Sequence, residues 1–139
     1  PLDIVPVIPG VFNIVHAENP GAAFSLLADA PLAVRRLVLV VLSGVVMVII
    51  GYLLFRPQPP NTRETAITPV GLSLVLGGAI GNFWDRIVVG TVTDFLQFFI
   101  GPYEYPSFNV ADSAITVGAG ILILEGFLHR EGAGREKRA

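Results

Sequence analysis

Three long apolar segments constrain this chain more than any other feature of its sequence. Residues 37–55 form an uncharged run of 19 residues, and residues 66–84 form a second uncharged run. A third apolar segment covers residues 111–128. Because an α-helix needs about 20 apolar residues to cross the hydrocarbon core of a bilayer, we expect a mainly α membrane protein with transmembrane helices over residues 32–55, 66–86 and 111–128.

The composition supports a membrane protein and excludes several classes of function. The chain is 53% hydrophobic and 14% charged, whereas soluble domains are roughly 25% charged. The net charge of −2, without a basic stripe, argues against a nucleic-acid partner. There is no Cys, so a thiol nucleophile and a disulfide framework are excluded. His16 and His129 lie at opposite ends of the chain, and we expect neither a metal site nor a cofactor.

The segments between the apolar runs carry turn and strand signals. Residues 4–8 and 11–15 are short β-type runs between prolines and glycines, so we expect residues 1–31 to form a β-rich segment outside the membrane. The Asn-Pro-Gly sequence at residues 19–21 is a strong turn signal. The link over residues 87–110 mixes β-branched and aromatic residues, which is compatible with a strand or with a short amphipathic helix at the membrane interface. We expect residues 1–139 to form a single domain.

The second apolar segment carries small residues at helical spacing. Ser73, Gly77 and Gly81 recur every four residues and would share one helix face, where small side chains let transmembrane helices pack closely. Asp85 continues that face, and Arg86 follows it directly. A helix-end ion pair between these two residues and a functional role for them are both compatible with this position.

The positive-inside rule orients the three helices. The tail over residues 129–139 shares a side with the loop over residues 56–65, and this side carries six of the nine Lys and Arg residues. We therefore expect the tail to lie in the cytoplasm. Residue 85 lies 19 residues, or about 28 Å of helix, beyond residue 66. Asp85, Asp94 and Asp112 should therefore all lie near the extracytoplasmic face.

Acidic side chains at membrane depth are candidates for function because they are costly there. Our main hypothesis is that Asp94 and Asp112 meet as a catalytic pair. Two close carboxylates do not both ionise readily, so one can take a proton from water while the other donates one to a carbonyl oxygen. Three other interpretations remain open. Asp112 has the position of a helix cap, Asp85 and Arg86 suit an ion pair in a small transporter subunit, and the chain could be a structural scaffold.

Four short motifs resemble those of the lipoprotein signal peptidase family, signal peptidase II. They are Asn-Pro-Gly-Ala-Ala-Phe-Ser at residues 19–25, Gly-Gly-Ala-Ile-Gly-Asn-Phe-Trp-Asp-Arg at 77–86, Val-Thr-Asp-Phe at 92–95, and Phe-Asn-Val-Ala-Asp-Ser at 108–113. Each motif alone is weak evidence. Their shared order and spacing make the resemblance specific.

The resemblance implies a membrane aspartic endopeptidase of the bacterial inner membrane, with its active site near the extracytoplasmic face. Its substrates would be prolipoproteins that carry diacylglycerol on a cysteine, and it would cut just before that cysteine. The enzyme would be a monomer whose partners are these lipidated signal peptides and membrane lipids. By the same resemblance the catalytic residues are Asp94 and Asp112, the substrate-binding residues are Asn19, Gly21, Asn82, Arg86 and Asn109, and Asp85 is a supporting residue.

The resemblance also implies an architecture. The family has four transmembrane helices, an extracytoplasmic β-cradle and a short interfacial helix, which we expect near the link over residues 87–110. Only three spans are readable in this sequence, so the first helix of the family is expected before Pro1.

Overall fold

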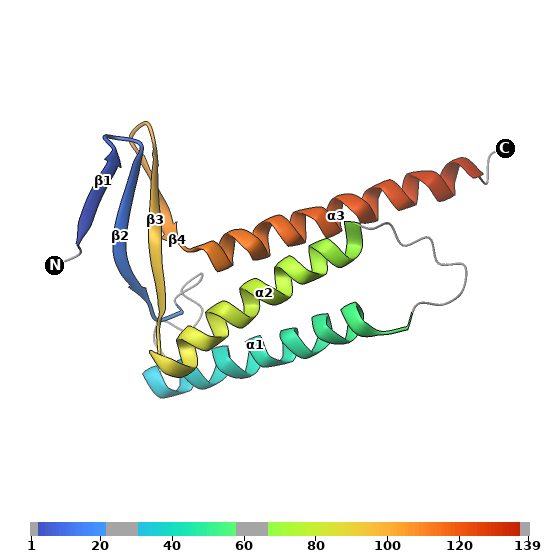
Figure 1. Ribbon diagram of the computed structural model, residues 1–139, viewed down its shortest axis with the longest axis horizontal. Coiled ribbons are helices and arrows are strands. Elements are labelled where there is room, and N and C mark those ends of the chain that lie inside the picture. Colours follow the sequence, from blue (N-terminus) through green and yellow to red (C-terminus); the bar gives the residue numbers. More distant parts are fainter. Residues whose placement is uncertain (1–2, 22–30, 58–66, 137–139) are drawn as a thin grey trace.

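The computed structural model describes residues 3–21, 31–57 and 67–136. In this part of the chain three long helices carry a small antiparallel sheet at one end (Figure 1). Some predicted features lie outside the described residues: motif residues 22–25, loop residues 58–65, residue 66 at the start of the second span, and residues 137–139 of the tail.

The helices are α1 (Leu32–Phe55), α2 (Ile67–Val88) and α3 (Val110–Glu136). Each contains a stretch long and apolar enough to cross a membrane, which in α3 ends at Leu128. The chain is therefore a multi-pass membrane protein, and the three predicted spans are confirmed. The backbone of α3 continues as helix beyond its apolar stretch, because the polar residues that follow contain no proline to end it.

Close packing between α2 and α3 depends on glycines. A Cβ atom on Gly78 would lie 2.4 Å from the backbone oxygen of Ala111, and one on Gly118 would lie 2.6 Å from the backbone oxygen of Gly71. Since no side chain fits at these distances, the two backbones approach directly, as small residues allow in membranes. One contact holds the start of α3 against the middle of α2, and the other holds Gly118 of α3 against the first turns of α2.

The predicted packing face of α2 was wrong. Space around Gly77 is open, and Ser73 is exposed. Gly81 lies at the edge of the contact, where a Cβ atom would meet the Cβ atom of Ala111 at 3.4 Å. The real contact uses Gly71 and Gly78, which are seven residues or about two helical turns apart. Its phase is set by the glycine of α3 that lies opposite, which the spacing within α2 does not reveal.

The sheet consists of β1 (Ile4–Ile8), β2 (Phe12–Asn19), β3 (Val92–Ile100) and β4 (Tyr103–Phe108), paired antiparallel in that order. Gly10 and Gly101 take positive φ angles of 73° and 61° in the two hairpin turns, where glycine is favoured. The predicted small sheet is confirmed. The link over residues 87–110 forms β3 and β4, so the short helix expected there is wrong for this segment: its β-branched and aromatic residues pair with β2 instead.

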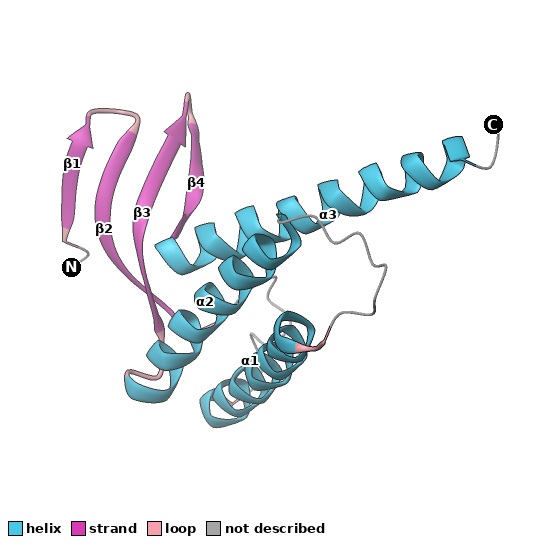
Figure 2. Cartoon of the chain, turned by 45° about the vertical axis from the view of Figure 1, so that its right-hand side comes forward, coloured by secondary structure: helices cyan, strands magenta, loops and turns pink. Residues whose placement is uncertain are grey.

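The sheet lies across one end of the helices (Figures 1 and 2). The strands run at a steep angle to the helix axes, and the two hairpin turns project beyond α3 on the side away from α1 and α2. β3 follows α2 after a short turn, and β4 leads directly into α3. As a result, the end of α2, the strand β3 and the start of α3 all meet where the sheet joins the bundle.

Candidate active site

Asp94 lies on β3, at the point where this strand pairs with the end of β2 opposite Ala17. Its side chain is 2% exposed. One carboxylate oxygen accepts a hydrogen bond from Asn19 Nδ2 at 3.0 Å, and the other accepts one from Asn109 Nδ2 at 3.0 Å. Both oxygens of this buried carboxyl group are thus held by amide donors from two different elements.

Asp112 lies in the first turn of α3, where it forms a capping box with Asn109. The Asp112 backbone N–H donates to Asn109 Oδ1 at 2.9 Å, and the Asn109 backbone N–H donates to Asp112 Oδ2 at 3.2 Å. The other carboxylate oxygen of Asp112 accepts a hydrogen bond from Asn82 Nδ2 at 2.7 Å. The helix-cap interpretation is therefore correct for Asp112, and it is compatible with a role in chemistry.

Asn109 connects the two aspartates. Its Nδ2 group donates to Asp94 Oδ1 and, at 3.1 Å, to Asn82 Oδ1. Its backbone N–H and its Oδ1 atom both bond to Asp112. One residue therefore touches both carboxyl groups. Because its Oδ1 faces a backbone N–H, which can only donate, the amide must point its nitrogen at Asp94.

Asn19 orients Asp94 from the other side. Its Oδ1 accepts the backbone N–H of Gly21 at 2.8 Å, which leaves its Nδ2 to face Asp94. Gly21 has a φ angle of +87°, and a Cβ atom there would lie 1.9 Å from Leu39 on α1. The Asn-Pro-Gly turn was predicted from the sequence. In the structure this turn packs against Leu39 of α1, and its Asn19 amide donates to the buried carboxyl group of Asp94.

Arg86 lies close to the two aspartates, but it does not form the expected ion pair with Asp85. Its Nη1 donates to the backbone oxygen of Asn82 at 3.0 Å. In residues 67–136 its buried Nε atom has no hydrogen-bond partner, and no bond joins its side chain to that of Asp85. The backbone oxygen of Asp85 accepts hydrogen bonds from the N–H groups of Val89 and Gly90, which are part of the turn that ends α2.

The surroundings of Asp94 change the pKa of its carboxyl group. Burial raises the pKa of Asp94, and the charge of Asp112 raises it further, while the amides of Asn19 and Asn109 and the charge of Arg86 lower it. Burial has the largest effect, so the pKa of Asp94 lies above its ordinary value. Asp112 lies in the first turn of α3, where its carboxyl group is held by Asn82 and by the backbone N–H of Asn109.

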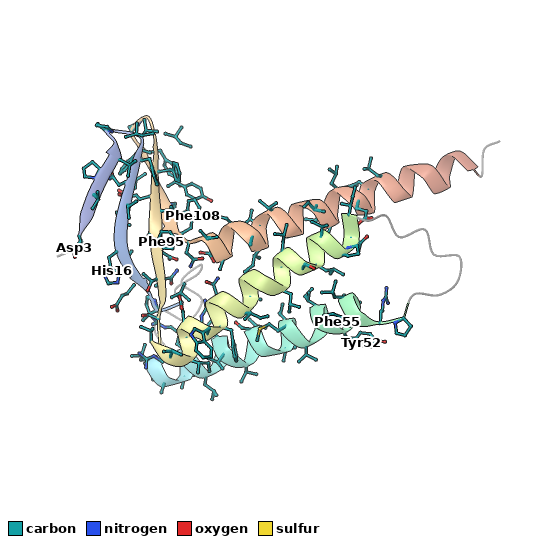
Figure 3. All side chains as sticks on the ribbon, viewed as in Figure 1. Asp3, His16, Tyr52, Phe55, Phe95 and Phe108 are labelled. Carbon is teal, nitrogen blue, oxygen red and sulfur yellow. The ribbon has the colours of Figure 1, made fainter. Side chains whose placement is uncertain are left out.

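A cavity of about 630 Å³ lies next to Asp112, between the sheet and α3. The sheet contributes mainly aromatic and aliphatic side chains, and α3 contributes residues of its first two turns. Phe98 stacks between Phe12 and Phe108, with ring centroids 4.6 and 5.9 Å apart. Phe108 lies beside the start of α3, whereas Tyr52 and Phe55 lie at the end of α1 far from the sheet (Figure 3). The lining of the cavity is mainly apolar, and its polar side chains are those of Tyr105, Asp112, Ser113 and Thr116.

The structure gathers most of the residues that the sequence singled out. Five of the eight take part in one hydrogen-bonded network: Asn19, Asn82, Asp94, Asn109 and Asp112. Gly21 and Arg86 bond to members of the network, and Asp85 does not. The asparagines were expected to bind substrate, but in the structure their amides bond to the two carboxyl groups and to each other.

The cavity residues of α3 were missed. Ser113, Thr116 and Val117 follow Asp112 at the spacing of one helix face, and this spacing could have identified them. Within the described ranges no group of three His, Cys, Asp or Glu side chains is placed to hold a metal ion.

A bundle of membrane-spanning helices with acidic and amide side chains gathered at one end is the architecture of a membrane-embedded enzyme, and the comparisons with known proteins make that enzyme a protease. The chain belongs to the signal peptidase II family: the family model described as "Signal peptidase (SPase) II" matches residues 2–128.

The chain is similar to lipoprotein signal peptidases of other bacteria. The lipoprotein signal peptidase of Solibacter usitatus is 45% identical over 124 residues, which cover 89% of this chain and 73% of the relative. The lipoprotein signal peptidase of a Sulfurihydrogenibium species is 41% identical over 119 residues, covering 86% of this chain and 71% of the relative.

Two solved structures, both described as bacterial membrane enzymes, have the same fold. The one solved at 2.3 Å has a TM-score of 0.78 at 28% identity, and the alignment covers 94% of this chain and 74% of the other. The one solved at 1.9 Å has a TM-score of 0.73 at 30% identity, with 88% and 74% covered.

Proposed function

We propose that this protein removes signal peptides from prolipoproteins whose cysteine carries diacylglycerol, and that it cuts the peptide bond just before that cysteine. We assign the catalytic roles to Asp94 and Asp112. The observation that carries this assignment is the bridge through Asn109, which bonds to both carboxyl groups where the sheet meets α3. Asp94 lies on β3 and Asp112 on α3, with β4 between them in sequence, and the fold brings both carboxyl groups to one amide.

The two aspartates take different roles in the proposed mechanism. Asp112, ionised at the start of α3, accepts a proton from a water molecule as the water oxygen attacks the carbonyl carbon of the scissile bond. Asp94, protonated, donates its proton to the carbonyl oxygen. The product of this step is a neutral tetrahedral diol, so no full charge develops on the carbonyl oxygen in the low-dielectric site.

The collapse of this intermediate restores both groups. Asp112 returns its proton to the nitrogen of the lipidated cysteine, the carbon–nitrogen bond breaks, and the new carboxyl group returns a hydroxyl proton to Asp94. Asn82 and Asn109 hold the carboxyl groups at fixed orientations throughout. Arg86 keeps a buried Nε donor without a partner among the described residues, and we assign this donor to a backbone carbonyl of the bound peptide, whose polar groups lipid cannot satisfy.

Location and assembly are part of the same proposal. The excess of Lys and Arg in the loop between α1 and α2 and in the C-terminal tail supports an orientation with the sheet on the extracytoplasmic side of the bacterial inner membrane. The active site would then lie near the outer end of a membrane-inserted signal helix. We propose that the protein acts as a monomer and meets its substrate by lateral diffusion in the bilayer.

A small transporter or scaffold subunit is the alternative, and it is not favoured. It relied on Asp85 and Arg86 as a gated ion pair, but Arg86 bonds to the backbone of Asn82. The relatives at 41–45% identity are lipoprotein signal peptidases.

The proposal is tested with purified protein in lipid nanodiscs and a lipidated precursor, with cleavage followed by mass spectrometry. We expect Asp94→Asn and Asp112→Asn each to lower the rate of cleavage by about 10²- to 10⁴-fold, the range of one general acid or base. Glu104→Gln is the matched control, because Glu104 is an exposed carboxyl group on β4 that bonds to Gln97. A folded Asp94→Asn or Asp112→Asn variant that cleaves at the wild-type rate would refute the assignment.

A further inference from the structure

Two arginines at the start of α1, Arg35 and Arg36, have no role in the function described so far. We infer that Arg36 is the centre of a binding site for the phosphate group of an anionic phospholipid of the surrounding bilayer. The site would join the start of α1 to the turn that follows α2. These two helix ends lie at the end of the bundle that carries the sheet (Figure 1). The inference goes beyond the proposed function and does not depend on it.

The side chain of Arg36 is held against the turn after α2. A Cβ atom on Gly90 would lie 2.5 Å from Cζ of Arg36, and 2.6 and 2.9 Å from its two Nη atoms, so the guanidinium lies directly on the glycine. Gly90 has a φ angle of +90°, which glycine adopts readily. Gly90 is buried, whereas Arg36 is exposed. The guanidinium therefore has a defined place between two helix ends and remains accessible from outside the protein.

The guanidinium in this place has no anionic partner from the protein. Among the residues that the structure describes, Arg36 forms no hydrogen bond and no ion pair. The sequence of α1 contains no Asp or Glu. A guanidinium has five N–H donors in a planar arrangement that matches the oxygens of a phosphate group. The donors of Arg36 are therefore available to an anion from outside the described part of the chain.

The position of Arg36 on α1 is unfavourable for a positive charge. Helical side chains lean towards the N-terminus, so the charge of Arg36 lies near the start of α1, where the helix end itself carries a partial positive charge. The first turn has no acidic residue, and the N-cap residue Pro31 provides no side-chain hydrogen bond. In the proposed orientation this end is also extracytoplasmic, where Lys and Arg are less common beside transmembrane helices. A bound phosphate would offset both positive charges.

The neighbouring side chains place Arg36 at the surface of the bilayer. Leu32 and Leu37 on α1, and Trp84 and Val88 on α2, are all exposed large apolar side chains on membrane-spanning stretches. Tryptophan is typical of the boundary between hydrocarbon and headgroups. An arginine at this level keeps its aliphatic stem in lipid and its charged group among the headgroups. The phosphate groups of phospholipids lie at the same level, whichever way the protein faces.

The charge of the site selects one class of phospholipid. A zwitterionic headgroup carries an ammonium group next to its phosphate, and this ammonium group would be repelled by Arg36 and by the positive end of α1. A headgroup such as that of phosphatidylglycerol has the phosphate alone. A ligand that binds only the folded protein raises its stability. We therefore expect anionic phospholipid to stabilise the protein by linking α1 to the turn at Gly90.

The test uses the purified protein in micelles of a neutral detergent, with phosphatidylglycerol or phosphatidylcholine of the same acyl chains added. Bound lipid is counted by native mass spectrometry, and the melting temperature is measured in the same samples. We expect the wild-type protein to bind phosphatidylglycerol about tenfold more tightly than phosphatidylcholine. At ten times the Kd of phosphatidylglycerol, the melting temperature should rise by about 4 °C.

Two variants of equal net charge locate the site. Arg36→Gln removes the guanidinium and should weaken the binding of phosphatidylglycerol about tenfold or more, because hydrogen bonds between charged groups are lost. It should also remove most of the rise in melting temperature. Arg56→Gln is the matched control, because Arg56 is an exposed arginine at the opposite end of the same helix. Arg56→Gln should keep the wild-type affinity at this site.

Several results would overturn the inference. These are equal affinities of the wild-type protein for the two lipids, a wild-type affinity for phosphatidylglycerol in Arg36→Gln, and an equal loss of affinity in Arg56→Gln. Inorganic phosphate that raises the melting temperature as much as phosphatidylglycerol does would assign the site to free phosphate instead of lipid. The readouts are binding and unfolding, so a protein that failed to cleave a lipidated precursor would overturn the proposed function and leave this site standing.

Discussion

Replacing Asn109 by Ser separates the two tasks of this residue. Asn109 caps α3 through its Oδ1 atom, which accepts the backbone N–H of Asp112, and it holds the site through its Nδ2 atom, which donates to Asp94 and Asn82. Serine is a good N-cap residue, so the variant keeps the first task. It has no amide nitrogen, so it loses the second. Asn109→Ala loses both.

The structure allows the size of each effect to be worked out. Two side-chain hydrogen bonds are lost in Asn109→Ser, one of them to a carboxyl group, and together they should cost about 2–4 kcal/mol of unfolding free energy. The loss of the cap in Asn109→Ala should cost about 1 kcal/mol more. Because Asp94 loses one of its two amide donors, its carboxyl group can rotate, and we expect kcat to fall about 100-fold in both variants.

The pH dependence adds a readout that a merely structural role would not change. In the proposed mechanism Asp94 acts in its protonated form, so kcat falls as the pH rises through its pKa. The Asn109 amide lowers the pKa of Asp94, against the larger effect of burial, which raises it. Removing the amide therefore raises this pKa further, and the alkaline limb of the kcat profile should move to higher pH in both variants.

The assay combines cleavage of a lipidated precursor across pH with thermal unfolding in the same lipid. Equal kcat profiles but different stabilities for the two variants would support the separation of tasks. An Asn109→Ser variant with wild-type kcat and an unmoved alkaline limb would refute the reasoning, because Asn109 would then be a helix cap only.

Two further predictions concern packing within the membrane. Gly78→Ala places a methyl group 2.4 Å from the backbone of the first turn of α3, so it should lower the unfolding free energy by about 1–3 kcal/mol and also lower activity. Gly77→Ala is the control, because its methyl group meets only open space and should leave stability and activity unchanged. Equal melting temperatures for the two variants would contradict the packing described above. Thr68→Val removes the hydroxyl that donates to the buried Glu125 at 2.5 Å, at the end of the bundle away from the aspartates. It should lower the unfolding free energy by about 1.5–3 kcal/mol without changing kcat. A changed kcat would show that this end of the bundle is coupled to the site.

The transmembrane helices could be predicted because the thickness of the bilayer sets their length. The uncharged run over residues 37–55 has about the length that one helix needs to cross the bilayer. In the structure it lies within the single helix α1 (Leu32–Phe55). The phase of helix packing could not be predicted in the same way. α2 carries four glycines and one serine at spacings that suit more than one face, and the choice of Gly71 and Gly78 depends on Gly118 of α3.

The residues of the candidate site could be predicted from the sequence, but the hydrogen bonds between them could not. Asp94 lies in the link between the second and third apolar segments, and Asp112 lies at the start of the third. The sequence therefore predicts that the two residues lie at the same end of the helices. Whether an asparagine faces substrate or a carboxyl group depends on distances of about 3 Å between different elements. For Asn82 these distances depend on the glycine contacts between α2 and α3 and on the start of α3. Sequence spacing within one helix contains no information about them.

The start of α3 is what makes two identical side chains unequal. Asp94 and Asp112 both accept two hydrogen bonds and share Asn109 as a neighbour. Asp94 is buried on a strand, where the N–H groups of the backbone are used by the sheet, and burial favours its neutral form. Asp112 is the third residue of a helix, where its carboxyl group accepts the backbone N–H of Asn109 in the capping box. In the proposed mechanism, the residue that closes the capping box of α3 is therefore the base, and the buried residue of β3, whose pKa is raised, is the acid.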